Sequence, residues 1–269
     1  MLQKKVGTLP EWDLTDLYDA PDNKKFSADM EQLKEMVHEF EKEFKNAILI
    51  QDAPVSDNAK RLKKSIVAYE NIANAMGRLS GFATLHHVTA TNDPVRTKFY
   101  GDTQVKITEI SNKIIFFELE LNSLSNEILE KLLNDEVLSS YRTWFENIRK
   151  YKPHQLSDEV EQIFHDKSMT SFSAWNRLFD QTISNMKVHI DGDSKSLEEA
   201  LNYLLSSQEK DRKNAFLSVT SKLKENISLF THIMNTICQD KSISDKWRKY
   251  KYSEQSRHLA NNIEPEVVD

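Results

Sequence analysis

The fold class is decided by residues 26–44, which read FSADMEQLKEMVHEFEKEF. Charged side chains alternate there with apolar ones that recur in steps of four and three residues, the spacing of one face of a helix. The apolar positions of this stripe are Phe26, Met30, Leu33, Val37, Phe40 and Phe44. The whole chain of 269 residues has only 5 Gly and 6 Pro, too few for the turns of a many-stranded β protein. We therefore expect an all-α fold, a multi-helix array of long amphipathic helices.

Composition excludes several classes of function. The 36 Lys and Arg residues are outnumbered by 42 Asp and Glu, so a general affinity for nucleic acid is disfavoured. The single cysteine, Cys238, excludes an internal disulfide or a cysteine-based zinc cluster, which suits a reducing compartment. The sequence has neither the apolar run of a secretory signal nor about 18 consecutive apolar residues for a membrane span. We expect a cytoplasmic protein without a membrane partner.

Further helical stripes and start signals follow along the chain. Asp93 before Pro94 predicts a capped helix start, Ser196 to Glu199 predicts a capping box, and Pro265 predicts a last helix start. The helical stripes run over 62–79, 95–121, 138–148, 172–179, 201–205 and 216–237. Alternating residues before the turn at Asp191-Gly192-Asp193 predict at most one small β-hairpin, near 186–195. We expect two helical regions, 1–115 and 116–269.

Three smaller expectations concern packing. Residues 8–22 predict an irregular segment held in place by its aromatic side chains, including Trp12. Gly77 and Gly81, four residues apart, predict a close approach by a neighbouring helix. Cys238 lies in an apolar stripe and predicts a small buried thiol.

The eight histidines form no metal-binding motif. No His-Glu-x-x-His pair is present, because position 42 after His38-Glu39 is Lys, and we expect His38 on the surface. The adjacent His86 and His87 point in different directions on a helix and cannot chelate one ion together. The Asp191-Gly192-Asp193 run lacks the spacing of a calcium loop and predicts a turn. We predict no catalytic, cofactor-binding or metal-binding residue.

Two clusters of side chains near the end of the sequence each allow two interpretations. Residues 241–252 combine five Lys and Arg with Trp247, Tyr250 and Tyr252, which could stack on bases or could be a helix with its aromatic side chains on the core. Arg257 and His258 are adjacent and could line a cleft, although Arg257 could equally cap or pair locally. These two residues are the candidate cleft-lining pair.

Several stretches together resemble a known family. In order, they read Leu9-Pro10-Glu11-Trp12-Asp13-Leu14-Thr15-Asp16-Leu17-Tyr18, Arg78-Leu79-Ser80-Gly81-Phe82-Ala83, Lys152-Pro153-His154-Gln155-Leu156-Ser157, Ala174-Trp175-Asn176-Arg177-Leu178-Phe179-Asp180, Asp191-Gly192, Asp245-Lys246-Trp247-Arg248 and Ser256-Arg257-His258-Leu259-Ala260-Asn261. On these motifs the chain resembles the N-terminal region of the bacterial oligoendopeptidase F group of thimet oligopeptidase-like zinc metallopeptidases.

The resemblance implies an all-helical peptidase with a deep channel that admits short peptides. It places the zinc, with its His-Glu-x-x-His motif, in a C-terminal catalytic domain beyond the matched region, so this chain alone is expected to bind no zinc and to be inactive. Its implied partners are short peptides, and a separately encoded C-terminal catalytic half is a further candidate. The helix that starts at Pro265 would have only one turn before Asp269, and a helix of one turn is not stable by itself. This pattern is typical of a truncated chain. A stand-alone helical protein that binds peptides without cutting them is the alternative.

Overall fold

The computed structural model describes residues 12–268, so Leu9, Pro10 and Glu11 of the first family motif lie outside the described residues. The described chain is mainly helical, with one two-stranded antiparallel hairpin, and the all-α expectation is confirmed. The chain divides into two compact units. Within the described range the first unit holds residues 12–45 and 64–114, and the second holds 46–63 and 115–268.

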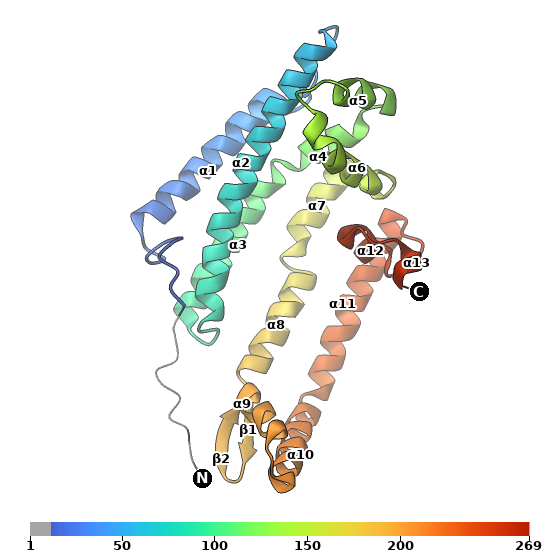
Figure 1. The fold of residues 1–269 in the computed structure, drawn as a ribbon. Coiled ribbons are helices and arrows are strands. Elements are labelled where there is room, and N and C mark those ends of the chain that lie inside the picture. The colour runs from blue at the N-terminus through green and yellow to red at the C-terminus, as the bar shows by residue number, and fades with distance from the viewer. Residues whose placement is uncertain (1–11, 269) are drawn as a thin grey trace. The chain divides into compact units, whose positions relative to one another are not determined.

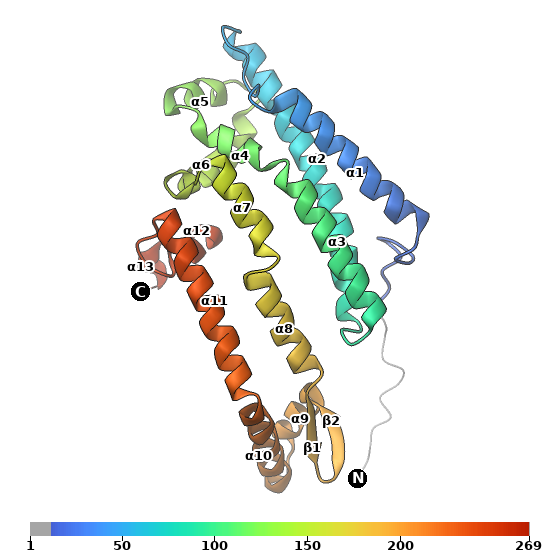
Figure 2. The same ribbon diagram turned by 180° about the vertical axis from the view of Figure 1, so that it is seen from behind.

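The first unit consists of three helices, which lie side by side in Figures 1 and 2: α1 (Lys24–Phe44), most of α2 (Val55–Val88) and α3 (Pro94–Asn112). All six stripe residues of α1 are buried, as predicted. An aromatic cluster occupies one end of this unit, where the Tyr18 ring meets Phe26 and Phe82 edge to face at 5.1 and 5.2 Å. Burying such rings away from water is the main source of the unit's stability.

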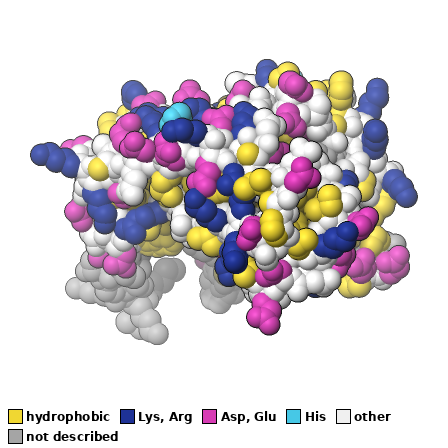
Figure 3. Space-filling model, turned by 90° about the horizontal axis from the view of Figure 1, so that it is seen from above, with side chains coloured by type: hydrophobic (Ala, Val, Ile, Leu, Met, Phe, Trp, Pro, Cys, Tyr) yellow, Lys and Arg dark blue, Asp and Glu magenta, His cyan; other side chains and the backbone are white. Residues whose placement is uncertain are grey.

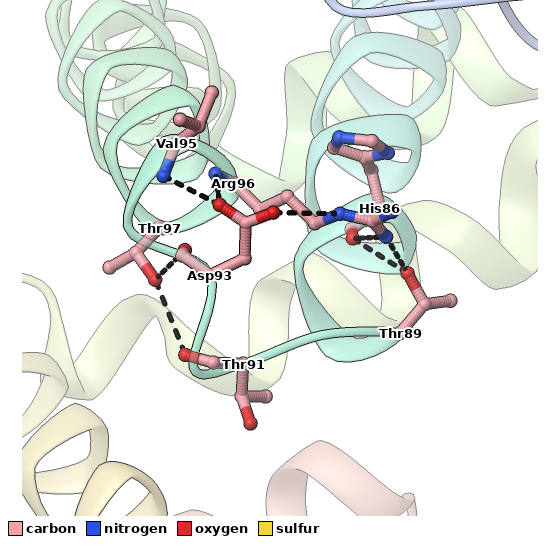
Figure 4. A network of polar contacts seen from close by, with 7 residues as sticks. All are labelled: His86, Thr89, Thr91, Asp93, Val95, Arg96 and Thr97. Atoms are coloured by element: carbon pink, nitrogen blue, oxygen red, sulfur yellow. Dashed lines mark hydrogen bonds and ion pairs between the residues drawn. The ribbon is translucent and has the colours of Figure 1, made fainter.

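The turn between α2 and α3 confirms the predicted cap (Figure 4). The Oδ1 atom of Asp93 accepts from the amides of Val95 and Arg96 at 2.8 and 3.3 Å, and Pro94 occupies the first helical position. The Arg96 guanidinium donates to the carbonyl of His86 at 3.1 Å and also to the Thr89 hydroxyl. The arginine thus ties the start of α3 to the end of α2.

The second unit opens with short helices around their own core. They are α4 (Ile115–Ser123), α5 (Asn126–Leu133) and α6 (Arg142–Tyr151), with the 3₁₀ turns η1 (Ser139–Tyr141) and η2 (Lys152–His154). Ser125 caps α5, because its hydroxyl accepts from the Ile128 amide at 3.2 Å. Arg149 of α6 donates to the carbonyls of Asn122 and Leu124 at 2.7 and 2.6 Å. These carbonyls have no partner within α4, so the arginine closes that helix end.

Three longer helices follow in the same unit. In Figures 1 and 2, α7 (Asp158–Ser168) and α8 (Phe172–Ser184) lie one after the other alongside α11 (Ile227–Arg248). Together these helices contain a single buried residue, Ile233. Their apolar side chains are therefore only partly buried, and several of them are exposed.

A small compact region connects α8 to α11. It comprises β1 (Lys187–Ile190), β2 (Asp193–Ser196), α9 (Leu197–Asn202), the 3₁₀ turn η3 (Tyr203–Leu205) and α10 (Glu209–Glu225). The strands pair with Lys187 opposite Ser196 and Ile190 opposite Asp193, so the predicted hairpin near 186–195 is confirmed. The capping box is also confirmed, because the Glu199 amide donates to the Ser196 hydroxyl and the Ser196 amide donates to the Glu199 carboxylate. After α11 come α12 (Gln255–Asn261) and α13 (Pro265–Val268), which starts at its predicted proline.

Two predicted long helices are each broken. The predicted helix over 95–121 ends at Asn112, because the amides of Lys113 and Ile114 donate to carbonyls only three residues back. The predicted helix over 216–237 is broken at Asn226, whose side-chain amide donates to the Lys222 carbonyl at 3.1 Å. Asn competes for backbone hydrogen bonds in this way and interrupts helices.

Two packing expectations are also wrong, and a third holds only in part. Cys238 is exposed, since α11 covers so little of its apolar face. A Cβ atom placed on Gly77 or Gly81 meets nothing within 4 Å among the described residues, so no helix packs closely there. The segment over 8–22 was also expected to be held by its aromatic side chains, and this is confirmed for Tyr18, which is 2% exposed, but wrong for Trp12, which is 68% exposed. The Phe172 and Phe179 side chains of the predicted α8 stripe are 46% and 42% exposed.

Candidate functional site

A cleft of about 1000 Å³ lies in the second unit between α7 and α8 on one side and α11 on the other. Its walls are mainly apolar, and they combine Ile163 and Phe164 of α7 and Phe172 of α8 with Ile237 and Ile243 of α11. Ile163 is 59% exposed and Ile243 is 46% exposed. Large apolar side chains that remain in contact with solvent inside a concavity are typical of a surface that receives a ligand or partner.

Beyond one end of the cleft, aromatic pairs join α8 to α11. Trp175 of α8 meets the ring of His232 of α11 edge to face at 5.3 Å, and Phe179 meets Phe230 at 5.6 Å. These pairs hold the middle of α8 against the first turns of α11.

The other end of the cleft is closed by an ion pair. The two terminal nitrogens of Arg248, on α11, donate to the two carboxylate oxygens of Glu161, on α7, at 2.7 and 2.8 Å. The side chains are 24% and 13% exposed, so solvent screens this pair less than a surface pair. The Glu161 carboxylate also accepts from the Leu156 amide at 3.0 Å. This is the bidentate geometry that gives arginine–carboxylate pairs their strength and direction.

The electrostatics of the pair follow from this geometry. Burial acts to raise the pKa of Glu161, but the hydrogen bonds from Arg248 and from the Leu156 amide outweigh it and hold that pKa below its usual value. The hydrogen bond to Glu161 raises the pKa of Arg248 against the opposing effect of burial. Both groups are therefore charged at neutral pH.

His154 completes the closed end. It is 8% exposed, and its ring stacks on Tyr250 at 4.2 Å. Its Nδ1 atom lies 2.8 Å from the carbonyl oxygen of Arg248, and its Nε2 atom lies 3.3 Å from the side-chain nitrogen of Gln255. A carbonyl can only accept and an amide NH₂ can only donate, so the arrangement assigns the proton to Nδ1 of a neutral imidazole. Lys249, with φ of 58°, supplies the left-handed turn between Arg248 and Tyr250.

The candidate pair Arg257 and His258 lies next to this cleft, on α12. Arg257 is exposed and His258 is half-buried, with its ring 5.8 Å from that of Tyr252. Neither is among the residues that line the cleft, whereas the preceding Ser256 is. Whether Arg257 and His258 face a peptide in a complete enzyme stays a prediction.

Two of the five basic side chains in the stretch over 241–252 have acidic partners. Lys241 donates to Asp245 at 2.6 Å and to the Ser256 hydroxyl at 3.2 Å, and Arg248 pairs with Glu161. Tyr250 faces inward on His154, as the core interpretation predicts, but Trp247 is 56% exposed. On the face drawn in Figure 3, positive and negative side chains are intermixed. A basic groove of the kind that binds nucleic acid is not a feature of this face.

Sequence reasoning did not assign Glu161, His154 or Arg248 to a site. Two of them lie in quoted family motifs, but only the fold shows that these motifs meet.

The residues do not provide a donor set for zinc. Between Trp12 and Val268, no group of three or more His, Cys, Asp or Glu side chains is placed to hold a metal ion. In the same range, no helix has both the length and the apolarity needed to cross a bilayer.

Comparisons with known proteins point to one family. The family model described as Oligopeptidase F matches residues 120–187. The chain is 24% identical over 290 residues to Oligopeptidase PepF of Bacillus subtilis, covering 99% of this chain and 41% of that protein. It is 22% identical over 213 residues to the Oligoendopeptidase F homolog of Borreliella burgdorferi, covering 78% of this chain and 36% of the relative.

Two solved structures share the fold. The crystal structure of oligoendopeptidase-F from Enterococcus faecium superimposes with a TM-score of 0.75 at 19% identity, over 91% of this chain and 48% of that one. A putative peptidase from Chlamydophila abortus gives a TM-score of 0.57 at 19% identity, over 95% of this chain and 43% of that one. The chain thus spans less than half the length of each of these four proteins.

Proposed function

This chain is homologous to the N-terminal part of oligopeptidase F, and from that premise we propose that it forms the channel-wall, substrate-access part of a zinc metalloendopeptidase that cleaves short peptides. The observation that carries the proposal is the match of almost the whole chain to 41% of the Bacillus subtilis oligopeptidase. Short peptides as substrates are inferred from the names of these relatives.

The architecture of the second unit supports a role in admitting peptides. A cleft with mainly apolar walls and an ion pair at one end accepts an extended chain or a few side chains and excludes a folded domain. In this role the chain's own residues select by shape and by burial of apolar side chains. When zinc is bound in the complete enzyme it supplies the chemistry of hydrolysis, and the residues described here do not hold it.

The proposal includes a domain division near residue 115 and a cytoplasmic location. The break between Asn112 and Ile115 supports the former. The single cysteine supports the latter, since thiols stay reduced in the cytosol.

The proposed inactivity of the isolated chain is tested with an internally quenched fluorogenic peptide and added Zn²⁺, with full-length Bacillus subtilis Oligopeptidase PepF as the positive control. We expect no zinc-dependent cleavage by the 269 residues alone. We expect activity when they are mixed with, or fused to, the part of that relative beyond the matched region. Cleavage by the isolated chain that a zinc chelator abolishes would contradict the proposed inactivity.

The cleft also favours a second candidate function, a stand-alone protein that binds peptides without cutting them. Isothermal titration of the isolated chain with short apolar peptides tests it. Saturable binding that is weakened by Ile243→Glu in the cleft supports this alternative. The control is Val95→Glu on α3, which should leave binding unchanged, because the Val95 side chain is 72% exposed and lies outside the cleft.

A further inference from the structure

We propose that Glu161, Arg248, His154 and Gln255 form a latch that sets the width of the cleft between α7 and α11. The inference deepens the proposed function, because the width of the cleft decides which chains enter it. Its test measures distances within the isolated chain and does not depend on peptide cleavage.

The first argument is that the ion pair joins this end of α7 directly to the end of α11. No residue of α7 is buried. Phe164 and Trp247 also meet between these helices, with ring centroids 6.5 Å apart, and the Arg248 guanidinium lies 5.6 Å from the Phe164 ring centroid. Of these contacts only the bidentate pair, at 2.7 and 2.8 Å, is a directional polar one that fixes the relative position of the two helices.

The second argument is that the latch is fully connected. The side chain of Arg248 donates to the Glu161 carboxylate, and the carbonyl of Arg248 accepts from Nδ1 of His154. Gln255 donates to Nε2 of His154 and accepts from the Lys251 amide at 2.7 Å, which fixes the orientation of its own amide group. A connected network of this kind has one geometry, whereas removal of one partner leaves a half-buried charge unpaired.

The third argument comes from the motifs. Three of the stretches that carry the resemblance to the peptidase family lie at or beside the latch: residues 152–157, 245–248 and 256–261. The first contributes His154, the second contributes Arg248, and Gln255 immediately precedes the third. Their meeting point is the latch, at the polar end of the cleft that Glu161, Arg248, Tyr250 and Ser256 line.

Distances between spin labels on the two helices test the latch. The labels are attached to cysteines in a Cys238→Ser background, because native Cys238 is exposed and would react. One pair, at Glu159 of α7 and Lys246 of α11, reports on the latch end. A second pair, at Asp180 of α8 and Thr231 of α11, reports on the aromatic end. All four positions are exposed and lie outside the residues that line the cleft.

With Arg248→Gln, we expect the 159–246 distance distribution to lengthen and broaden while the 180–231 distribution keeps its mean and width. Arg248→Lys keeps the charge but loses the bidentate geometry, so its effect should be intermediate. Arg142→Gln serves as the matched control, since Arg142 pairs with Glu130 on the surface of the same unit at 3.0 Å, and it should change neither distribution.

Two results overturn the proposal. An unchanged 159–246 distribution in Arg248→Gln shows that other contacts set the width. Equal broadening at both ends shows that the pair supports the whole unit rather than the cleft. Either result leaves the proposed channel-wall function to be judged by its own cleavage assay.

Discussion

The guanidinium of Arg78 lies over the ring of Tyr18, 5.3 Å from its centroid, and donates to the carbonyls of Asp16 and Leu17 at 3.0 and 2.9 Å. The arginine of one family motif thereby holds the described part of another against α2. The two motifs have a structural role in the first unit, because they anchor the segment that precedes α1.

Replacing Arg78 with Ala should release this segment. We expect the amides of Leu17 and Tyr18, which donate to the Leu14 carbonyl, to exchange with solvent deuterium faster, with a loss of about 1–2 kcal/mol of local stability. The matched control is Lys34→Ala, since Lys34 forms an exposed pair with Glu31 at 2.7 Å and should cost less than about 0.5 kcal/mol. Equal protection in both variants would show that the segment is anchored without Arg78.

The Tyr18 hydroxyl should lose its proton at an unusually high pH. Burial, followed by the hydrogen bond from its hydroxyl to Asp29 at 2.8 Å, raises the pKa of Tyr18 to about 12. The folded state keeps the proton that the unfolded chain loses near pH 10, so this group stabilises the fold below pH 10 and the contribution is lost as the pH rises toward 12. Ultraviolet difference titration of the wild type against Tyr18→Phe isolates this group, and a difference step near pH 10 would contradict the assignment.

Glu161 should make the second unit sensitive to acid. The pKa of Glu161 is held below its usual value, so the stability it provides is present above about pH 4.3 and is lost as the pH falls through the lowered pKa. We expect Glu161→Gln to lower stability at pH 7 and to flatten the decline in acid, measured by urea unfolding at a series of pH values. Glu127→Gln is the control, since its partner Lys131 is on the surface. A decline in acid that is as steep in Glu161→Gln as in the wild type would assign the acid sensitivity to other groups.

Two glycines should respond in opposite directions to the same substitution. Gly192 has φ of 90° in the hairpin turn, where an L side chain is strained, so Gly192→Ala should destabilise by about 1 kcal/mol or more. Gly77 is helical with open space at its Cβ position, so Gly77→Ala should stabilise by roughly 0.5–1 kcal/mol. Thermal unfolding of both variants measures these changes. A destabilised Gly77→Ala variant would instead support the close helix packing that the sequence suggested.

Local patterns predicted the parts of the fold that local interactions control. The stripe from Phe26 to Phe44, the Asp93 cap and the Ser196 capping box depend on residues within one or two helical turns, and all three are present. The hairpin follows in the same way from alternation and from Gly192. Helix breaks were predicted less well, because the local preference by which Asn226 ends a helix is small and a continuous apolar stripe conceals it.

The sequence by itself determined the helical class, the caps, the hairpin and the family resemblance, since each is encoded in residues close together in the chain. Only the tertiary structure decided that Cys238 is exposed and that Gly77 is uncrowded, because burial depends on which helices pack against a face. It also decided where the cleft lies and that His154, Glu161 and Arg248 meet at its end. Arg248 and Glu161 are distant in sequence, and no local periodicity specifies a hydrogen bond that forms only when two helices come together.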